Sequence, residues 1–379
     1  MIITGAQNPW TGAPQAIKLV NGHLESVDVP TAEADLHLPN TTVYPGFINT
    51  HDHLEFNLFP AIKNKTYSDW IDWGAEVHVH FKDLIQQITK VPFNTRVAIG
   101  QLKCLLNGIT TVIHHGPEQI PSTDWLSIWQ NYHYLHTVQK YIQRPYQSLF
   151  WSKDKPLMVH LAEGVTTRVT KEFSQISRLN IRRAPIIGIH GIALTPQQAG
   201  RLHALIWCPD SNQFMYEAHA DVEALANTTT ILFGTDSTVT SQWSWFAQLR
   251  SALEYGPWNA EELLGILYDH PTKIFPDFSN LGSLKPGKAA DLVFMEGTHS
   301  KPGLHLIQGN AKDILLVVKR GRVAMMDDRI ANQLPPTLKG NMVLVSVEGT
   351  NKWIPNTFSE ALSSVNHLKP IVPHLPTLA

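Results

Sequence analysis

The sequence predicts an α/β protein built around a parallel barrel of the (β/α)8 type. Short apolar runs, typical of buried parallel strands, recur between residues 42 and 233. The segments between them are long enough for amphipathic helices, as at 96–106 and 195–202. Because such alternation favours a parallel sheet, and about eight units fit into about 240 residues, we expect the sheet to close into a barrel.

Seven apolar runs are the expected barrel strands: 42–48, 110–113, 132–138, 157–161, 186–189, 204–208 and 230–233. A regular barrel needs one more strand. One unit is therefore expected to be hidden, shortened or absent.

Both ends of the chain predict small antiparallel strands instead. Short β-rich runs occur at 16–20, 23–27, 290–295 and 314–318. Asn21-Gly22 separates two of them, and such a pair is a tight-turn signal. After residue 350 the chain is rich in proline, with room for a short helix at 358–364 and a tail that packs on the surface or on a second subunit.

Composition narrows the class of protein. The 379 residues carry 30 basic and 32 acidic side chains, a net charge of -2 without a long basic run, which argues against nucleic-acid or anionic-membrane binding. No stretch approaches the roughly 20 apolar residues of a membrane span. Cys104 and Cys208 offer no disulfide framework, so a cytoplasmic location is expected. The 19 histidines are unusually many, and histidine is the commonest metal ligand.

The sharpest motif is Pro45-Gly46-Phe47-Ile48-Asn49-Thr50-His51-Asp52-His53-Leu54, at the end of the first strand. Side chains alternate along a strand, so His51 and His53 project to the same side, at the barrel mouth. Two imidazoles held in this way form half of a metal site. Taken alone, such a pair also occurs by chance or at the surface.

Three later strand ends add the remaining ligand types. The segment Val159-His160-Leu161-Ala162-Glu163-Gly164 closes one strand, Ile189-His190-Gly191 the next, and Gly234-Thr235-Asp236-Ser237 the last. Structural need alone does not explain polar groups at four strand ends. The sequence therefore predicts a metal-dependent active site at the mouth.

At this point the chain resembles the amidohydrolase superfamily of metal-dependent hydrolases, over nearly its full length. The matching segments, in order, are PGFINTHDHL, LLNGITTVIHHG, HLAEG, GIHGIAL, WCPDSN, FGTDS and LGSLKPGKAADLVFMEG. The resemblance implies a small β-sandwich built from both chain ends, and hence three parts: 1–42 with 284–345 (the sandwich), 43–283 (the barrel) and 346–379 (a tail). The span 116–158 is too short for the two regular units that the family places there, so the barrel is expected to be distorted or to lack a unit.

The resemblance also implies roles for individual residues. His51, His53, His160 and Asp236 match the ligands of a single divalent metal ion, for which zinc is the best fit and iron, manganese or cobalt are alternatives. His190 matches the histidine that orients the water or polarises the substrate. Glu163 matches the proton-shuttling glutamate of the branch with guanine, cytosine and adenosine-type deaminases and triazine hydrolases. Such a metal brings the pKa of a bound water toward about 7, which makes hydroxide available as the nucleophile.

Other readings stay open for several of these residues. Glu163 could cap a helix, and His190 could bind a metal directly in a binuclear site. Lys140 could be a carboxylated lysine that bridges two metals, or a solvated residue at a helix start.

Substrate contacts are the weakest expectation. At least one of His114 and His115 is expected to line the pocket, although packed histidines are equally compatible with the sequence. Trp70, together with Trp73, lies in the loop where relatives cover the substrate, and Asn212 belongs to the WCPDSN segment.

The function that these expectations predict is hydrolysis of a C–N bond, with release of ammonia from an amino-substituted, nucleobase-like heterocycle. The partners would be that small molecule and water, and a homodimer is compatible with the tail. The first rival is another hydrolase of the same fold, which opens a cyclic amide as an imidazolonepropionase does or dechlorinates a triazine. The second rival is a catalytically silent barrel that serves as a binding or scaffold protein.

Overall fold

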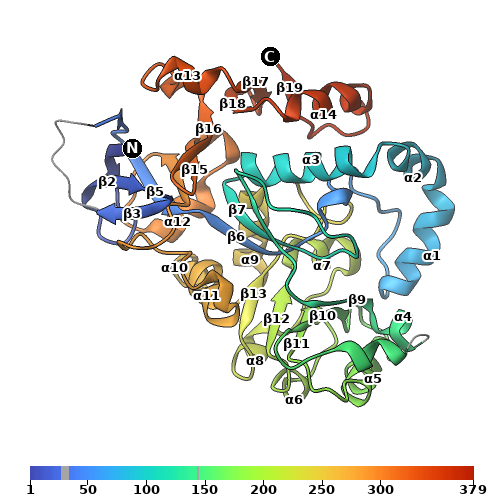
Figure 1. Ribbon diagram of the computed structural model, residues 1–379. Helices are drawn as coiled ribbons and strands as arrows, with labels where there is room; N and C mark the ends of the chain where they lie inside the picture. The colour runs from blue at the N-terminus through green and yellow to red at the C-terminus, as the bar shows by residue number, and fades with distance from the viewer. Residues whose placement is uncertain (27–33, 143–144) are drawn as a thin grey trace.

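The computed structural model describes residues 1–26, 34–142 and 145–379 (Figure 1). Residue 27, the last of the expected strand 23–27, lies outside the described residues, as do 143 and 144 within the short span 116–158. The chain forms a mixed α/β fold in which two parallel sheets lie beside a larger, mostly antiparallel one.

The two parallel sheets contain the strands expected in the barrel. A three-stranded sheet has the order β6-β7-β8 and a five-stranded sheet the order β13-β12-β11-β10-β9, and every ladder in both is parallel. The bounds are β6 (Phe47–Asp52), β7 (Ile109–His114), β8 (Ser127–Trp129), β9 (His133–Thr137), β10 (Leu157–Leu161), β11 (Ile186–His190), β12 (Ala204–Trp207) and β13 (Ile231–Phe233). The strand missing from the sequence prediction is β8, which is only three residues long.

The expected closure into one barrel is not seen among the described residues, because no ladder joins β8 to β9 or β13 to β6. Residues 130–132, which connect β8 to β9, contain no helix. Individual hydrogen bonds nevertheless bring β13 to β6: the Thr50 hydroxyl donates to the Phe233 carbonyl at 2.8 Å, and the Asp236 amide donates to the His51 carbonyl at 3.1 Å. The carboxyl ends of these two strands therefore lie side by side.

The third sheet has 11 strands and joins both chain ends, in the order β19-β17-β18-β16-β15-β14-β5-β1-β2-β3, with β4 paired to β1. Its strands are β1 (Ile2–Gln7), β2 (Pro14–Val20), β3 (His23–Ser26), β4 (Leu36–His37), β5 (Thr41–Pro45), β14 (Leu292–Glu296), β15 (Ile314–Lys319), β16 (Arg322–Asp327), β17 (Met342–Val347), β18 (Thr350–Pro355) and β19 (Thr377–Leu378). The central junction is antiparallel pairing of β5 with β14. The C-terminal residues thus supply strands to this sheet; the division into three parts stays a prediction.

Helices cover the parallel strands. The α-helices are α1 (Trp70–His80), α2 (Lys82–Thr89), α3 (Phe93–Leu106), α4 (Val138–Ile142), α5 (Glu172–Leu179), α6 (Pro196–Ala199), α7 (Pro209–Tyr216), α8 (Val222–Ala226), α9 (Trp245–Tyr255), α10 (Ala260–Leu264), α11 (His270–Ile274), α12 (Pro302–Gln308), α13 (Pro336–Lys339) and α14 (Phe358–Val365). Short 3₁₀ turns are η2 (Leu54–Phe56), η3 (Pro145–Phe150), η4 (Val169–Lys171), η6 (Pro276–Phe278), η7 (Ala311–Asp313), η8 (Asp328–Ile330) and η9 (Asn366–Leu368), and η5 (Gly265–Asp269) is a π-helix. Helices expected at 96–106, 195–202 and 358–364 correspond to α3, the shorter α6 and α14.

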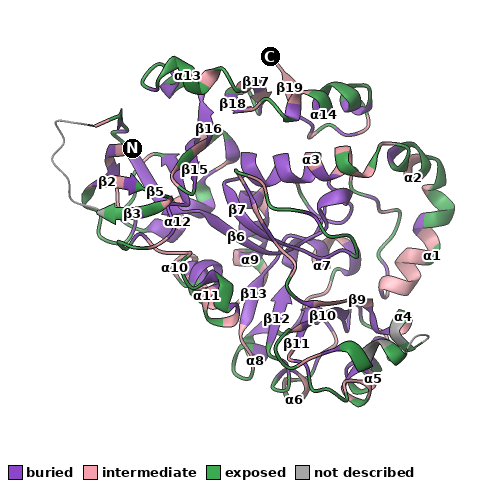
Figure 2. Cartoon of the chain, in the orientation of Figure 1, coloured by how far each residue is buried: buried purple, intermediate pink, exposed green. Residues whose placement is uncertain are grey.

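Burial separates a packed core from an open edge. The parallel strands and most of α3 are buried, whereas α1 and α2 are largely exposed or half-buried (Figure 2). Apolar side chains such as Ile113, Met158, Ile206 and Leu232 pack together between the parallel strands. This apolar cluster packs between the parallel strands whose carboxyl ends carry the polar residues described next.

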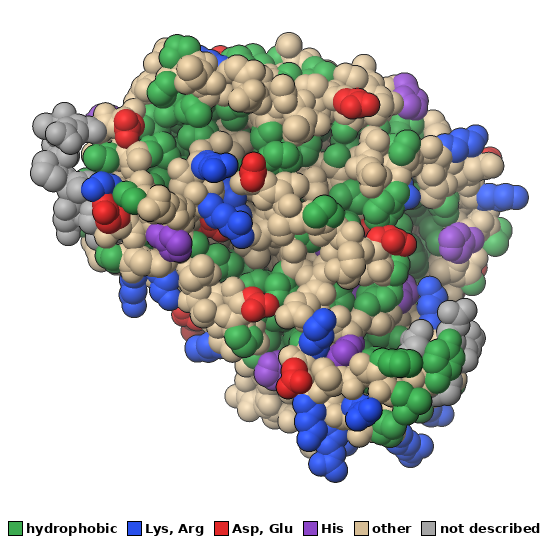
Figure 3. All heavy atoms as spheres, viewed as in Figure 1, with side chains coloured by type: hydrophobic (Ala, Val, Ile, Leu, Met, Phe, Trp, Pro, Cys, Tyr) green, Lys and Arg blue, Asp and Glu red, His purple; other side chains and the backbone are tan. Residues whose placement is uncertain are grey.

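The surface carries charges of both signs. On the face drawn in Figure 3, acidic and basic side chains are interspersed, and several Lys and Arg side chains gather at its lower end, over α5 and α6. No helix among the described residues has both the length and the apolar composition needed to cross a membrane.

Candidate active site and metal centre

The predicted ligands converge at the carboxyl ends of the parallel strands. His51 lies in β6 and His53 directly follows it, His160 lies in β10, and Asp236 follows β13. All four residues are buried, and none is more than 7% exposed. Residues distant in sequence therefore meet in one polar cluster, as the strand-end pattern predicts.

Three imidazole nitrogens lie at the spacing that a metal ion requires. His160 Nε2 is 3.3 Å from His53 Nε2 and 3.4 Å from His51 Nε2. Two nitrogens that each lie about 2.0–2.1 Å from a tetrahedral zinc ion are about 3.3–3.4 Å apart. Asp236 Oδ1 is 3.9 Å from His51 Nε2 and 3.8 Å from His53 Nε2, so a carboxylate oxygen borders the same position. The residues present fit a divalent cation.

The protonation states suit ligation as well. His160 Nδ1 lies 2.8 Å from the His136 carbonyl, which only accepts, so Nδ1 carries the proton and Nε2 presents its lone pair to the cluster. Burial lowers the pKa of His51 and of His160 well below its ordinary value, and neighbouring histidines lower it further. The rings are therefore neutral, which is the form that binds metals.

Asp236 is held as an anion by its neighbours. Its Oδ2 accepts hydrogen bonds from the Ser211 hydroxyl at 2.9 Å and the Thr240 hydroxyl at 3.0 Å, and its Oδ1 accepts from the Ser237 amide at 2.7 Å. Burial raises the pKa of Asp236, but nearby histidines and these donors outweigh it, and the net pKa is lowered. The carboxylate is thus available to a cation near neutral pH.

Glu163 and His190 form a second pair beside the ligands. The Tyr216 hydroxyl donates to Glu163 Oε1 at 2.7 Å, and the same oxygen lies 3.7 Å from His190 Nε2. Burial raises the pKa of Glu163 above its ordinary value. A carboxyl group of this kind can take up and return a proton near neutral pH.

Asn212 lies behind this pair rather than in the pocket. Its Oδ1 is 2.8 Å from His190 Nδ1, and the residue is fully buried. It does not line the pocket, and its expected role as a substrate contact stays a prediction.

Backbone conformation helps to aim these side chains. Ala162, His190 and Asp236 have φ values of 54°, 70° and 58°, in the left-handed region that residues other than glycine seldom adopt. Each lies at or just after the end of a parallel strand. Such strain persists where the surroundings impose it and is frequent at functional sites.

A pocket of about 520 Å³ opens over the cluster. Its apolar wall includes Trp70 and Trp73 from α1, with Phe56, Phe59 and Met215. Both tryptophans therefore stand where the sequence predicted a cover for the substrate.

His115 and His114 differ in where they point. His115 lines the pocket and shares a cluster with His51, His53 and His160, with ligand atoms within 4.8 Å of one another. His114 is fully buried and is not part of the pocket lining. The alternation of β7 distinguishes the two, because the inward-facing Ile113 lies two residues before His115.

Lys140 lies in α4, the short helix that directly follows β9. Its side chain is exposed and borders the pocket mouth. This position does not resemble that of a buried ligand shared by two metals.

Glu172, which the sequence patterns did not indicate, joins α1 to the loop that contains Glu163. Glu172 Oε2 accepts from the Ala162 amide at 2.8 Å, and Glu172 Oε1 accepts from Trp70 Nε1 at 3.1 Å. Beside it, Asp69 caps α1 and pairs with Arg168, with Arg168 Nη2 2.6 Å from Asp69 Oδ1. The only sequence signal was the capping pattern at Asp69.

A buried lysine supports the site from the other side. Lys103 Nζ, from α3, donates to Asp52 Oδ2 at 3.1 Å, to Asn57 Oδ1 at 2.8 Å and to the Asp236 carbonyl at 3.3 Å. Because these groups follow β6 and β13, Lys103 joins the two strand ends at which ligands stand.

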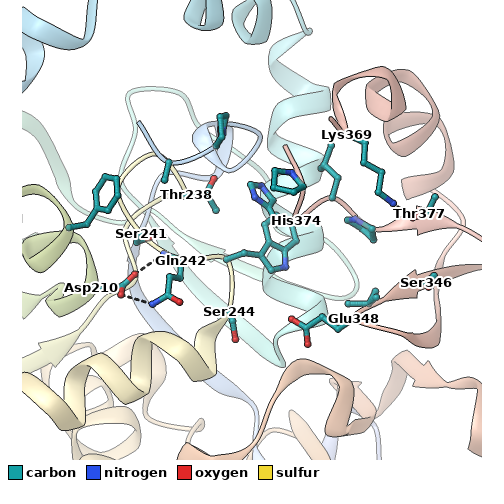
Figure 4. Close-up of a pocket in the computed structure, with 18 of the residues that line it drawn as sticks. Asp210, Thr238, Ser241, Gln242, Ser244, Ser346, Glu348, Lys369, His374 and Thr377 are labelled. Atoms are coloured by element: carbon teal, nitrogen blue, oxygen red, sulfur yellow. Dashed lines mark hydrogen bonds between the residues drawn. The ribbon is translucent and has the colours of Figure 1, made fainter. Parts of the chain in front are cut away.

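A second cavity, of about 900 Å³, shares a wall with the site (Figure 4). Segments 59–62, 213–215 and 237–241 contribute some residues to one cavity and the others to its neighbour. Figure 4 shows Asp210 bonded to Gln242 on one side and Glu348 and Lys369 on the side of the C-terminal segment. His374 lines this cavity and stacks on Trp243, with ring centroids 4.7 Å apart.

Comparison with known proteins places this geometry among characterised folds. No family model and no curated protein sequence matches the chain. Solved structures do match: an adenosine deaminase from Xanthomonas campestris with bound zinc has a TM-score of 0.65 at 17% identity, over 85% of this chain and 92% of that one. The chain shares its fold.

Two further structures extend this likeness. A triazine hydrolase variant has a TM-score of 0.67 at 15% identity, over 88% of this chain and 95% of that one. A guanine deaminase from C. acetobutylicum, with guanine in its active site, has a TM-score of 0.60 at 13% identity, over 85% and 99%. These are enzymes that the motif resemblance named, so that resemblance is confirmed at the level of the fold.

Proposed function

We propose that the chain is a metal-dependent hydrolase that releases ammonia from an amino-substituted nitrogen heterocycle. The single observation that carries the proposal is the spacing of the His51, His53 and His160 nitrogens, at the distances of a tetrahedral site, in the pocket that holds Glu163. A scaffold protein has no physical need to bury such a cluster. The similar fold of zinc-bound adenosine deaminase supports the same conclusion.

In this proposal His51, His53, His160 and Asp236 hold one divalent ion. Zinc is the proposed ion, because three imidazole nitrogens and one carboxylate suit it best. When bound, such an ion supplies Lewis acidity and lowers the pKa of water.

The chain's own groups handle the protons. Glu163 takes a proton from the attacking water and returns it to the ring nitrogen or the departing amine, and its raised pKa suits both steps. The hydroxyl of Tyr216 fixes the Glu163 carboxyl group, and Asn212 orients His190 beside it. Trp70 and Trp73 offer flat apolar faces to a heterocycle. The cytoplasmic location and the homodimer expected from the sequence stay predictions.

The test combines metal analysis with product analysis. Protein purified without chelator should contain about one equivalent of zinc by plasma mass spectrometry, and His51→Ala should lose both metal and turnover. Ammonia release is then measured across purines, pyrimidines, pterins and triazines. Chloride release or ring opening without ammonia would replace deamination by one of its rivals, and absence of metal after reconstitution would leave a silent barrel.

A further inference from the structure

Glu55 is a buried residue with one carboxylate oxygen, Oε2, that has no hydrogen-bond partner among the described residues. It lies in η2, two residues after His53, is 6% exposed and lines the pocket. The electrostatic neighbours of the carboxylate include His53 and Arg96. The Arg96 guanidinium bonds to the backbone carbonyl of Glu55, at 3.2 Å, and so fixes the turn rather than the carboxylate.

The nearby ring nitrogen of His114 does not satisfy Oε2, because it accepts a hydrogen bond from the Leu54 amide at 3.3 Å and so carries no proton to donate. His114 Nδ1 is 3.7 Å from Glu55 Oε2, which is beyond hydrogen-bond distance. Burying an unpaired carboxyl group costs free energy, and buried polar groups in folded proteins are nearly always paired. Stability therefore does not account for Glu55, whereas a ligand that supplies the missing donor would.

Two other side chains of the same pocket each have a polar atom without a hydrogen-bond partner among the described residues. His115 Nε2 lies 3.3 Å from the Met158 carbonyl and therefore carries the ring proton, so the unpartnered, fully buried Nδ1 presents a lone pair. Tyr134 packs on His115 with ring centroids 5.0 Å apart, and no hydrogen bond engages its hydroxyl. All three side chains line the same pocket.

These three groups form a polar subsite distinct from the proton-transfer groups. Glu55, His115 and Tyr134 come from η2, from the residue after β7, and from β9. Glu163 follows β10 and His190 ends β11, and the pocket wall includes the aromatic side chains of Phe56 and Trp73 as well as polar ones such as His136. A flat ring that reacts at Glu163 therefore offers another of its edges to the subsite.

We propose that Glu55 is a specificity-determining residue that accepts a hydrogen bond from a second amino or N–H group of the substrate. The inference rests on the proposed function and names its substrate class: heterocycles with two amino-type donors, one lost at the metal centre and one bound by Glu55. His115 Nδ1 accepts from the same edge of the ring. A ring with only the reacting amine leaves the Glu55 carboxyl group unpaired, and such mismatches are strongly disfavoured.

The test uses substrate pairs that differ by one amino group and have no ring N–H: 9-methyladenine against 9-methyl-2,6-diaminopurine, and 2-amino-1,3,5-triazine against 2,4-diamino-1,3,5-triazine. The enzyme should prefer the diamino member of at least one pair by about tenfold or more in kcat/KM. Glu55→Leu should reduce that ratio to about threefold or less, with unchanged metal content. Glu76→Gln is the control and should keep the preference, because Glu76 is a half-buried carboxylate of α1 that pairs with Lys65 and His80 and does not line the pocket.

Melting temperatures provide a second readout. Glu55→Leu removes an unpaired group and should leave the melting temperature equal or higher, whereas Glu172→Leu removes a carboxyl group with two donors and should lower it. Loss of metal in Glu55→Leu would overturn the inference, because the carboxylate would then act at the metal centre.

The design separates the two proposals. Ammonia release without a diamino preference overturns the role of Glu55 and leaves deamination standing. If no pair yields ammonia, the dissociation constants of the same pairs are measured by calorimetry. Tighter binding of the diamino member that is lost in Glu55→Leu would support the subsite although deamination fails. Equal affinities for both members would overturn the subsite as well.

Discussion

Glu163 is the residue at which proton transfer can be separated from metal binding. Glu163→Gln keeps the shape of the side chain and the contact with Tyr216 but cannot carry the proton. We expect kcat to fall by about 10²–10⁴-fold while the metal content is unchanged. The measurement pairs steady-state kinetics with plasma mass spectrometry, and near-normal turnover would remove the shuttle role.

Glu172 makes stability depend on pH. Burial raises its pKa from 4.5 to about 7, against the opposing effect of its two hydrogen bonds. Between these values the unfolded chain ionises while the folded carboxyl group stays protonated. The free energy of unfolding should therefore decrease, by up to about 3 kcal/mol, as pH rises from 4.5 to about 7.

Glu172→Gln is the comparison for this effect, because it removes the titration and keeps the side-chain shape. Urea unfolding at intervals between pH 4.5 and 8 should show a smaller decrease in the variant than in the parent. Parallel curves for the two proteins would mean that Glu172 does not titrate in this range.

At the level of single residues, strand alternation identifies the groups that point into the site. It places His51 with His53, and it also separates His115 from His114. Glu55, Tyr216 and Glu172 could not be found in this way, because their roles depend on partners from distant segments. Nothing local in the sequence indicates that Glu172 has a donor for each carboxylate oxygen and that Glu55 Oε2 has none among the described residues.

At the level of elements, α3 is joined to β6 and β13 by the ion pair of Lys103 and Asp52. Lys103→Met leaves a buried carboxylate without its cation and should reduce the free energy of unfolding by about 3–5 kcal/mol. Adding Asp52→Asn should recover part of that loss, since the stranded charge is removed. Urea unfolding of the parent, Lys103→Met, Asp52→Asn and the double variant, at matched metal content, gives the coupling energy between the two side chains. Strictly additive losses would contradict the ion pair.

Helix α1 contributes more to the pocket than to the core. Trp73 is only partly buried, so Trp73→Ala should raise KM by about tenfold while unfolding changes by less than about 2 kcal/mol. Trp207→Ala, at a fully buried position, is the matched control and should cost about 3–5 kcal/mol. An unchanged KM in Trp73→Ala would remove α1 from the substrate wall.

Helices and strands are predicted correctly where the segment is long enough to show a repeated hydrophobic pattern. Helix α3 and the apolar strands β10 and β11 have clear patterns and appear where expected. Strand β8 holds only Ser127, Ile128 and Trp129, too short a run for any period to be recognised. That one omission is the unit missing from the predicted barrel.

At the level of the whole molecule, the C-terminal segment is part of the fold. Residues 341–379 supply β17, β18 and β19, and α14 lies against α3 (Figure 1). A chain that ends at residue 340 exposes the apolar face of α3 and should melt at a markedly lower temperature or aggregate. Scanning calorimetry of the truncated and full chains checks this, and equal melting temperatures would show that the segment is dispensable.

The pairing of β5 with β14 also sets the order of events during synthesis. Strand β5 leaves the ribosome roughly 250 residues before β14, a delay of roughly 12 to 50 s at ~5–20 residues per second. Throughout that interval one edge of β5 has no neighbour, and such edges invite pairing with other nascent chains. In a cell that makes this protein quickly, the open edge of β5 is therefore exposed to other nascent chains until residues 292–296 have emerged.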